Sequence, residues 1–339
     1  MTPPSDRIFD SETFRLHIKN NRSGEEVFRI THERFQKALE RHRDLSPRIE
    51  YSIDWDLDNF DDYIAGAHGL ITWDLPQEGL AERAPNLRWI HIIGAGIEHL
   101  KPLDWLPSHI ALTNSKGVHK KKAQEYVAMA LLMLNARLPA LFTQQRAHSF
   151  ESVFTGRIAG KTLLVVGAGH MGEAAAKAGK SLELKTLGTR KSGTLREGFD
   201  EMFQPDQLDR LLGEADFIVL TPPLTEETKG LMSNERLAHC KMGAGLINMS
   251  RGPVLDHEAL AMALDSGRLS GAVIDVTDPE PLPAGSPLWD QANLIITPHV
   301  SSDDEEEYIP LVLDLVLANV ARDLAGQALI NRVDPRLGY

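Results

Sequence analysis

The amino-acid sequence predicts an α/β protein whose parallel sheets are covered by helices on both faces. Short apolar segments rich in branched residues alternate with amphipathic segments along most of the 339 residues. A glycine-rich turn joins one of these apolar segments to an alanine-rich segment. Hydrophobic residues make up 42% of the chain and charged residues 25%, which is typical of a globular protein with a sizeable core. Strands that alternate with helices favour parallel sheets.

The middle of the chain carries the clearest alternation. Its predicted strands are residues 162–166, 184–188, 216–220, 245–249, 272–276 and 294–297. Its predicted helices are residues 171–182, 205–214 and 257–269. Because helices connect successive strands, we expect the strands to run parallel in one doubly wound sheet.

The two ends of the chain show the same pattern more loosely. Predicted strands are residues 14–19, 49–53, 69–72 and 89–93, and Thr31 is a candidate cap for a helix over 31–43. A long helical pattern covers residues 120–145, where Pro139 should kink or break the helix. The last predicted helix covers residues 305–324, and the acidic run 303–307 suits its positive N-terminal end.

Composition disfavours several classes of function. The formal net charge of −12 argues against a nucleic-acid partner, because binding to a polyphosphate needs a basic surface. No run of about 18 apolar residues suggests a membrane span, and the first 14 residues show no secretory signal. The single cysteine, Cys240, excludes an intrachain disulfide and favours a cytoplasmic protein. No histidine spacing demands a metal, so we expect none.

The glycine-rich turn carries the first specific chemical signal. Gly167, Gly169 and Gly172 form a G-x-G-x-x-G motif between a strand and a helix, the context of a Rossmann-type dinucleotide site. The glycines allow a tight turn, close approach of a pyrophosphate and close packing of the helix on the strand. His170 and Met171 lie inside the motif, where we expect backbone N–H groups rather than side chains to face the pyrophosphate.

The strand after this motif indicates which dinucleotide is preferred. A site for NAD usually has Asp or Glu about 20 residues further on, where the carboxylate binds the ribose 2′-hydroxyl. No carboxylate lies between positions 183 and 197, and the segment instead contains Thr189, Arg190, Lys191 and Ser192. Arginine can hold a 2′-phosphate with two charge-assisted hydrogen bonds. The segment therefore predicts NADP(H) in preference to NAD(H), although a solvated basic loop would have the same composition.

Three reactive side chains follow three predicted strands. Arg251, Glu280 and His299 come after the strands near 245–249, 272–276 and 294–297. Ligands of open α/β sheets bind outside the carboxyl ends of the strands. Histidine can protonate a developing alkoxide near neutral pH, and a carboxylate neighbour such as Glu280 would fix its ring and keep it charged. Arg251 could grip a carboxylate and polarise the adjacent carbonyl.

These motifs together resemble the D-isomer-specific 2-hydroxyacid dehydrogenase family, which includes glyoxylate and hydroxypyruvate reductases. The matching stretches are GAGHMG, TPPLTEETKGLM, LINMSRGPVLDHEAL, AVIDVTDPEPLP, SPLW and NLIITPHVS, with looser matches at 93–97 and 113–118. Arg190 stands where many members have Asp, which resembles the NADP-using branch. In the glycine-rich turn, Ala168 and Met171 stand where family members frequently have Leu and Ile. These exchanges between apolar residues do not change the predicted dinucleotide site.

The resemblance implies roles for individual residues. Arg251, Glu280 and His299 correspond to the catalytic residues of the family, and Asp275 to the aspartate that binds the nicotinamide carboxamide. Backbone amides near Ala95 and Gly96 are implied to hold the substrate carboxylate. The loop against the cofactor would contain Thr221 and Pro222.

The resemblance also implies an architecture. A Rossmann-type nucleotide domain, residues 115–300, would be inserted into a smaller flavodoxin-like substrate domain formed by residues 1–114 and 301–339. The helix from Lys120 resembles the family's dimerisation arm and implies a homodimer.

The implied activity is NADPH-dependent reduction of a small 2-keto acid, of the glyoxylate or hydroxypyruvate type, to the D-2-hydroxy acid. The nicotinamide would supply the hydride and His299 the proton. Two alternatives remain open at this point. The same scaffold could act on phosphite or a bulkier keto acid, or the protein could be a dinucleotide-sensing interaction protein without turnover.

Overall fold

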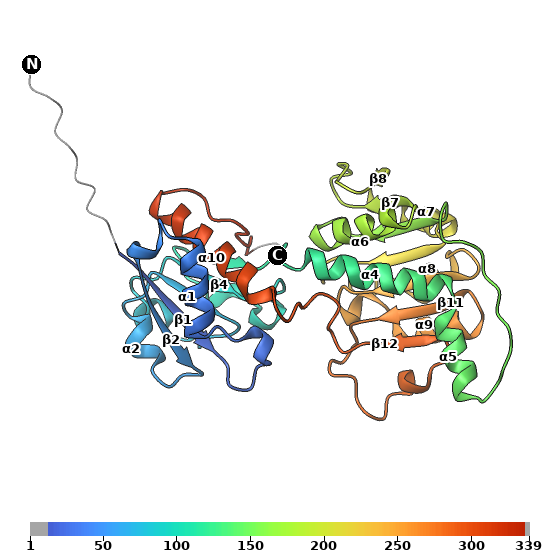
Figure 1. The fold of residues 1–339 in the computed structure, drawn as a ribbon, viewed down its shortest axis with the longest axis horizontal. Coiled ribbons are helices and arrows are strands. Elements are labelled where there is room, and N and C mark those ends of the chain that lie inside the picture. Colours follow the sequence, from blue (N-terminus) through green and yellow to red (C-terminus); the bar gives the residue numbers. More distant parts are fainter. Residues whose placement is uncertain (1–12, 336–339) are drawn as a thin grey trace, which may run out of the picture. The chain divides into compact units, whose positions relative to one another are not determined.

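The protein folds into two compact units, shown in a computed structural model that describes residues 13–335 (Figure 1). The first unit contains the chain up to Val118 and from Asp304 onward, and the second unit runs from His119 to Asp303. The predicted domain boundaries lay after residues 114 and 300. Residues 115–118 group with the first unit, where the Ser115 amide donates to the carbonyl of Gly94 at 3.0 Å. The expected lack of a secretory signal concerns residues that lie mostly outside the described range.

The first unit is built on a parallel sheet with the strand order β2-β1-β3-β4-β5. In this flavodoxin-like order, β2 lies on one side of β1, and β3, β4 and β5 follow one another on the other side. The strands are β1 (Phe14–Asn20), β2 (Ile49–Trp55), β3 (Gly69–Thr72), β4 (Trp89–Ile92) and β5 (Ala111–Asn114). The helices are α1 (His32–Arg41), α2 (Phe60–Ile64), α3 (Leu80–Arg83) and α10 (Tyr308–Leu324).

Two hydrophobic layers enclose this sheet. Side chains of α1 and α10 pack with Ile71 on one face, whereas α2 and α3 pack with Leu70 on the other. Neighbouring strand residues point to opposite faces, so both Leu70 and Ile71 are fully buried. Thr31 caps α1 as predicted, because its side chain accepts a hydrogen bond from the Arg34 amide.

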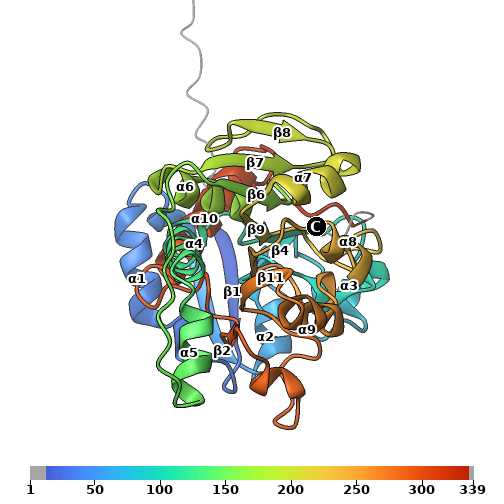
Figure 2. The same ribbon diagram turned by 90° about the vertical axis from the view of Figure 1, so that its right-hand side faces the viewer.

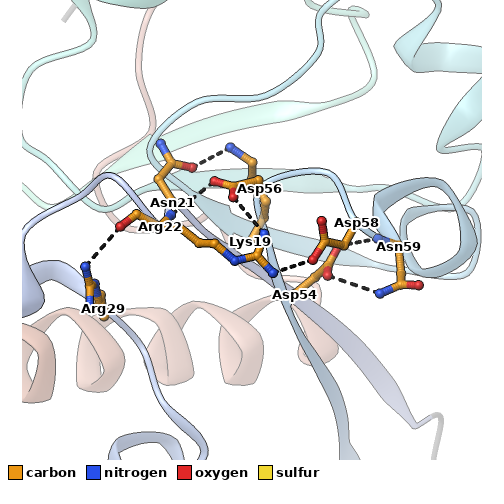
Figure 3. Close-up of polar contacts among 8 residues, drawn as sticks. All are labelled: Lys19, Asn21, Arg22, Arg29, Asp54, Asp56, Asp58 and Asn59. Carbon is orange, nitrogen blue, oxygen red and sulfur yellow. Dashed lines mark hydrogen bonds and ion pairs between the residues drawn. The ribbon is translucent and has the colours of Figure 1, made fainter.

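Ion pairs connect the loops at the carboxyl edge of this sheet (Figure 3). Arg22, just after β1, donates to Asp56 at 2.9 Å and also pairs with Asp58, both of which follow β2. The buried ammonium group of Lys19 pairs with Asp74, which follows β3. These contacts hold the first three strand-end loops in fixed positions relative to one another.

The second unit is built on a longer parallel sheet with the order β12-β11-β10-β9-β6-β7-β8. Its strands are β6 (Thr162–Val166), β7 (Lys185–Thr189), β8 (Glu201–Phe203), β9 (Phe217–Leu220), β10 (Ala244–Asn248), β11 (Leu269–Ile274) and β12 (Leu294–Ile296). The order reverses between β6 and β9, which is the switch point of a Rossmann-type sheet. The predicted fold class is therefore confirmed.

Helices cover both faces of this second sheet (Figure 2). One hydrophobic cluster joins the sheet to α4 and α6, and the other joins it to α7, α8 and α9. These helices are α4 (Lys120–Asn135), α6 (His170–Ser181), α7 (Leu208–Glu214), α8 (Asn234–Ala238) and α9 (His257–Asp265). Leu163 and Leu164 of β6 belong to different clusters, as strand alternation requires.

The long predicted helix from residue 120 is divided into α4 and α5 (Leu138–Arg146). Arg137 has φ +58°, so the chain leaves the helical conformation before Pro139, which then lies in the first turn of α5. Within residues 13–335 no single helix is long and apolar enough to cross a membrane, although α4 and α5 together pass by length and composition across a 64° bend.

Candidate active site

The glycine-rich turn follows β6 at the switch point of the second sheet. Gly167 has φ +95°, and a Cβ atom there would lie 2.6 Å from the amide nitrogen of Pro222. A Cβ atom on Gly172 would lie 2.6 Å from the carbonyl oxygen of Gly167. A Cβ atom on Gly169, by contrast, would contact nothing within 4 Å, so space remains beside the backbone at the start of α6. The turn therefore leaves the approach to the N-terminus of this helix open, and helix N-termini attract anions.

Thr221 and Pro222 form the other side of this turn. The Thr221 hydroxyl donates to the carbonyl oxygen of Gly167 at 2.8 Å, and the Thr221 amide donates to the carbonyl oxygen of Val166 at 2.9 Å. The loop after β9 therefore contacts the glycine-rich turn directly and sets its shape.

The basic segment after β7 has one available cation. Arg190 is half-buried and its amide donates to Phe203 at 3.0 Å, while no carboxylate in the described part of the chain pairs with its guanidinium group. Lys191 pairs with Glu227 at 2.5 Å, and Thr189 is buried, with its carbonyl accepting from the amides of the glycine-rich turn. Arg190 is thus the member of the segment best suited to bind an external phosphate.

Glu280 and His299 lie together beyond the ends of β11 and β12. His299 Nδ1 is 2.6 Å from Glu280 Oε1, and Glu280 Oε2 accepts from the Thr277 amide at 3.3 Å. The two side chains are 43% and 42% exposed, so the pair is accessible from solvent. Within residues 13–335 no hydrogen bond engages His299 Nε2, which leaves that nitrogen available to a bound molecule.

Arg251 follows β10 in the same sheet. Its Nη1 donates to the carbonyl oxygen of Ser250 at 2.8 Å. A guanidinium group carries five N–H donors in a planar fork, a geometry that suits carboxylates. A Cβ atom on the adjacent Gly252 would lie 2.0 Å from the carbonyl oxygen of Thr277. The absence of a side chain there brings the loop carrying Arg251 against the loop that leads to Glu280.

Asp275 is almost completely buried, and its carboxylate is engaged by the protein itself. It accepts hydrogen bonds from the Thr297 hydroxyl at 2.6 Å and from the amides of Val300 and Ser301 at 2.9 and 3.0 Å. The carboxylate therefore holds the turn that carries His299, a contact that the sequence did not suggest.

His119 and Asp303 form a second titratable pair that sequence reasoning missed. His119 Nδ1 lies 3.6 Å from Asp303 Oδ1. Burial lowers the pKa of His119 to about 4; a hydrogen bond to the Ser302 carbonyl opposes this shift, and the electrostatic effects of Arg251 and His299 add to it. Burial raises the pKa of Asp303 to about 6, although His299 opposes this effect. No local sequence signal could pair residues so far apart in the chain.

Ala95 and Gly96 belong to the first unit, in the loop after β4. The Ala95 carbonyl accepts from the Asn114 side chain at 2.7 Å, which fixes the loop. In the described part of the chain their own backbone N–H groups donate to no acceptor. The preceding Gly94 lies against Trp73, because a Cβ atom there would be 2.5 Å from the indole ring. Two free amides at a strand end can bind an anion.

No group of three or more metal-binding side chains occurs among residues 13–335. The glycine-rich turn at the switch point and the polar side chains at neighbouring strand ends define a dinucleotide-dependent enzyme.

Comparison with known proteins shows which family of such enzymes the chain belongs to. The model of the D-isomer specific 2-hydroxyacid dehydrogenase NAD-binding domain matches residues 128–301. The chain belongs to this family of oxidoreductases, and the resemblance noted in the sequence is confirmed.

Individual relatives agree with this assignment. A glyoxylate reductase of Thermofilum pendens is 33% identical over 262 residues, which cover 74% of this chain and 77% of that protein. A glyoxylate/hydroxypyruvate reductase B of Yersinia pestis is 31% identical over 282 residues, 81% of this chain and 84% of that protein. A crystal structure of a family member from Xanthobacter autotrophicus Py2, in complex with NADPH and MES, has a TM-score of 0.81 at 30% identity. That match covers 96% of this chain and 100% of the other.

Proposed function

We propose that the protein reduces a small 2-keto acid, of the glyoxylate or hydroxypyruvate type, to the D-2-hydroxy acid with NADPH. The observation that carries the proposal is the hydrogen-bonded pair of His299 and Glu280 at neighbouring strand ends of the dinucleotide-binding unit. Relatives named glyoxylate reductase and glyoxylate/hydroxypyruvate reductase support the substrate class.

His299 is the proposed proton donor. Reduction of a ketone develops negative charge on oxygen, and an imidazolium can supply the proton that neutralises it. Glu280 accepts from Nδ1, so the ring is held with Nε2 directed away from the carboxylate. Arg251 would bind the substrate carboxylate or polarise the reacting carbonyl with its planar guanidinium group. When bound, the nicotinamide supplies the hydride.

The site geometry fits a dinucleotide with a 2′-phosphate. Gly169 leaves open space at the start of α6, where His170 and Met171 would offer backbone N–H groups to the pyrophosphate. Arg190 would hold the 2′-phosphate, with Lys191 and Ser192 beside it. We therefore propose a preference for NADP(H) over NAD(H). Asp275, with three donors already on its carboxylate, would act on the nicotinamide mainly through the turn that it holds.

Ala95 and Gly96 are proposed to bind the carboxylate of the substrate. Their free amides form a small anion site of fixed geometry after β4. Such a site binds the carboxylate equally well in the ground state and in the transition state. Its disruption should therefore raise KM for the keto acid more than it lowers kcat.

The second unit carries an apolar surface that supports a homodimer. Exposed apolar side chains lie on α4, on α5 and in the segment after α5, namely Met129, Leu132, Phe142, Phe150 and Phe154. Phe150 and Phe154 are essentially fully exposed, which is unusual for phenylalanine in an isolated chain. Sedimentation of the wild type and of Phe150→Ser/Phe154→Ser tests this proposal, since loss of the dimer is expected in the double variant.

The single buried cysteine supports a cytoplasmic location.

Oxidation of NADPH and of NADH, followed by absorbance, tests the function. Glyoxylate, hydroxypyruvate, pyruvate and phenylpyruvate are offered in turn. Faster oxidation of NADPH with the two small keto acids is the expected result. Binding of NADPH without turnover of any keto acid would contradict the proposal and favour a dinucleotide sensor.

A further inference from the structure

The turn that carries His299 has a strained backbone. His299 has φ +57°, in the left-handed region that residues other than glycine adopt only uncommonly. Its amide donates to the carbonyl oxygen of Asp275 at 2.8 Å, and the next two amides donate to the carboxylate of the same residue. A strained turn persists only when its surroundings hold it. Here Asp275 provides three of the contacts that hold it.

The carboxylate of Asp275 is itself oriented by a chain of hydroxyl groups. Thr297 Oγ1 lies 2.6 Å from Asp275 Oδ1, and an ionised carboxylate can only accept, so the threonine proton points to Asp275. The Tyr126 hydroxyl lies 2.8 Å from the same Thr297 Oγ1. With the threonine proton already used, Tyr126 must be the donor in this contact. Burial raises the pKa of Tyr126, so the phenol keeps the proton that it donates.

Tyr126 brings this chain of hydrogen bonds to a rigid part of the unit. It lies in α4, is 8% exposed, and has fully buried Val127 and Ala130 near it in the same helix. Helix α4 packs against α6 and the sheet in one hydrophobic cluster. The phenol oxygen therefore has little freedom, although Tyr126 and Thr297 are 171 residues apart in the chain.

We propose that Tyr126 is a positioning residue for the proton donor. Its hydroxyl fixes Thr297, Thr297 fixes the carboxylate of Asp275, and Asp275 fixes the turn that sets the ring of His299 against Glu280. Tyr126 touches neither substrate nor cofactor in this role. The inference rests on the proposed function for its catalytic consequence, but its structural part can be tested without turnover.

The kinetic test combines Tyr126→Phe with Thr297→Val in a double-mutant cycle. Misplacement of a catalytic group lowers kcat, so we expect Tyr126→Phe to lower kcat for keto acid reduction about 10-fold, with KM changed little. Thr297→Val should lower it at least as much, and Thr297→Ser less, because serine retains the bridging hydroxyl. The double variant should be no slower than Thr297→Val alone, since residues of one hydrogen-bond network are not additive.

Thr143→Val is the matched control. The Thr143 hydroxyl, in α5, accepts from the Asn293 amide at 3.0 Å, so the substitution removes a similar contact beside β12 without affecting Asp275. We expect this control to lose thermal stability as Tyr126→Phe does but to keep the wild-type kcat. A kcat for Tyr126→Phe equal to that of the control, or additive effects in the cycle, would overturn the proposal.

Hydrogen exchange of the backbone amides separates this inference from the proposed function. In the full-length protein without substrate, Tyr126→Phe should accelerate exchange at Val300 and Ser301 several-fold, whereas Thr143→Val should not. If the wild type reduces no keto acid but these amides respond as expected, the proposed function fails and the positioning role stands. Unchanged exchange in Tyr126→Phe would refute the positioning role whatever the activity.

Discussion

His299 Nδ1 lies 2.6 Å from Glu280 Oε1, across the ends of two neighbouring parallel strands, β12 and β11. The contact joins an imidazole and a carboxylate that are 19 residues apart in the chain. It leaves the other ring nitrogen free of any hydrogen bond within residues 13–335. An imidazole with one nitrogen engaged by a carboxylate and the other available is suited to move a proton at a bound substrate.

The first prediction concerns the proton donor. His299→Ala should lower kcat for keto acid reduction by roughly 10²- to 10⁴-fold, because general acid catalysis contributes about that factor. Binding of NADPH should change little, since His299 lies away from the glycine-rich turn in sequence and has no proposed role in binding the dinucleotide phosphates. Steady-state kinetics and NADPH fluorescence titration check both parts. Preserved kcat with lost NADPH binding would reverse the assignment.

The second prediction concerns the partner of the imidazole. Glu280→Gln keeps the size of the side chain but removes the charge that stabilises an imidazolium and selects its tautomer. We expect kcat to fall about 10- to 100-fold, less than in His299→Ala, and the double variant to be no slower than His299→Ala. Glu214→Gln, at an exposed acidic residue, is the control. An equal loss of kcat in Glu280→Gln and in this control would show that Glu280 does not assist His299.

The third prediction concerns the choice of dinucleotide. Arg190→Asp places a carboxylate where a 2′-phosphate is proposed to bind. Repulsion between the two negative groups should weaken the binding of NADPH far more than the binding of NADH. A loss on the order of 10- to 100-fold in affinity for NADPH is expected, from charge-assisted hydrogen bonds of about 1.5–3 kcal/mol. Arg210→Asp is the control, because this exposed arginine pairs with Glu214 in α7. An unchanged ratio of NADPH to NADH affinity in Arg190→Asp would remove Arg190 from the site.

The fourth prediction concerns stability in acid. Burial lowers the pKa of His17 from 6.5 to about 4, with Asp54 opposing the shift. Between these two values the unfolded chain binds a proton that the folded chain does not, so the free energy of unfolding falls as pH decreases. The contribution of His17 to the free energy of unfolding is present above pH 6.5 and is lost progressively as the pH falls toward 4. The total loss is on the order of 3 kcal/mol.

His17→Gln should flatten this pH dependence. Urea unfolding of the wild type, of His17→Gln and of the exposed control His32→Gln, at about pH 7 and about pH 5, measures the effect. We expect the loss of stability on acidification to be smaller in His17→Gln than in the other two proteins. The same loss in all three would show that His17 is not the group responsible.

Much of the site could be predicted because its signals are local. A turn that needs glycine at 167 and 172, and reactive side chains directly after apolar strands, are short-range features of the chain. Parallel strands place their carboxyl ends at one edge, so Arg251, Glu280 and His299 could be assigned to the same edge from sequence order alone. The short strands β5 and β8 and the short helices α2 and α3 were missed, because segments of three to five residues carry too little periodicity.

Short-range features of the chain were enough to predict the alternation of strands and helices, the glycine-rich turn and the identity of the residues at the strand ends. The packing of the folded chain was needed to show that the Tyr126 hydroxyl reaches Thr297 and that the carboxylate of Asp275 binds its own turn. It was also needed to show that Lys191 has a carboxylate partner, whereas Arg190 has none within residues 13–335. Local structure follows from backbone preferences and periodicity within a few residues. Contacts between distant side chains depend instead on how helices pack on the sheet, to within fractions of an ångström, and no short segment encodes that distance.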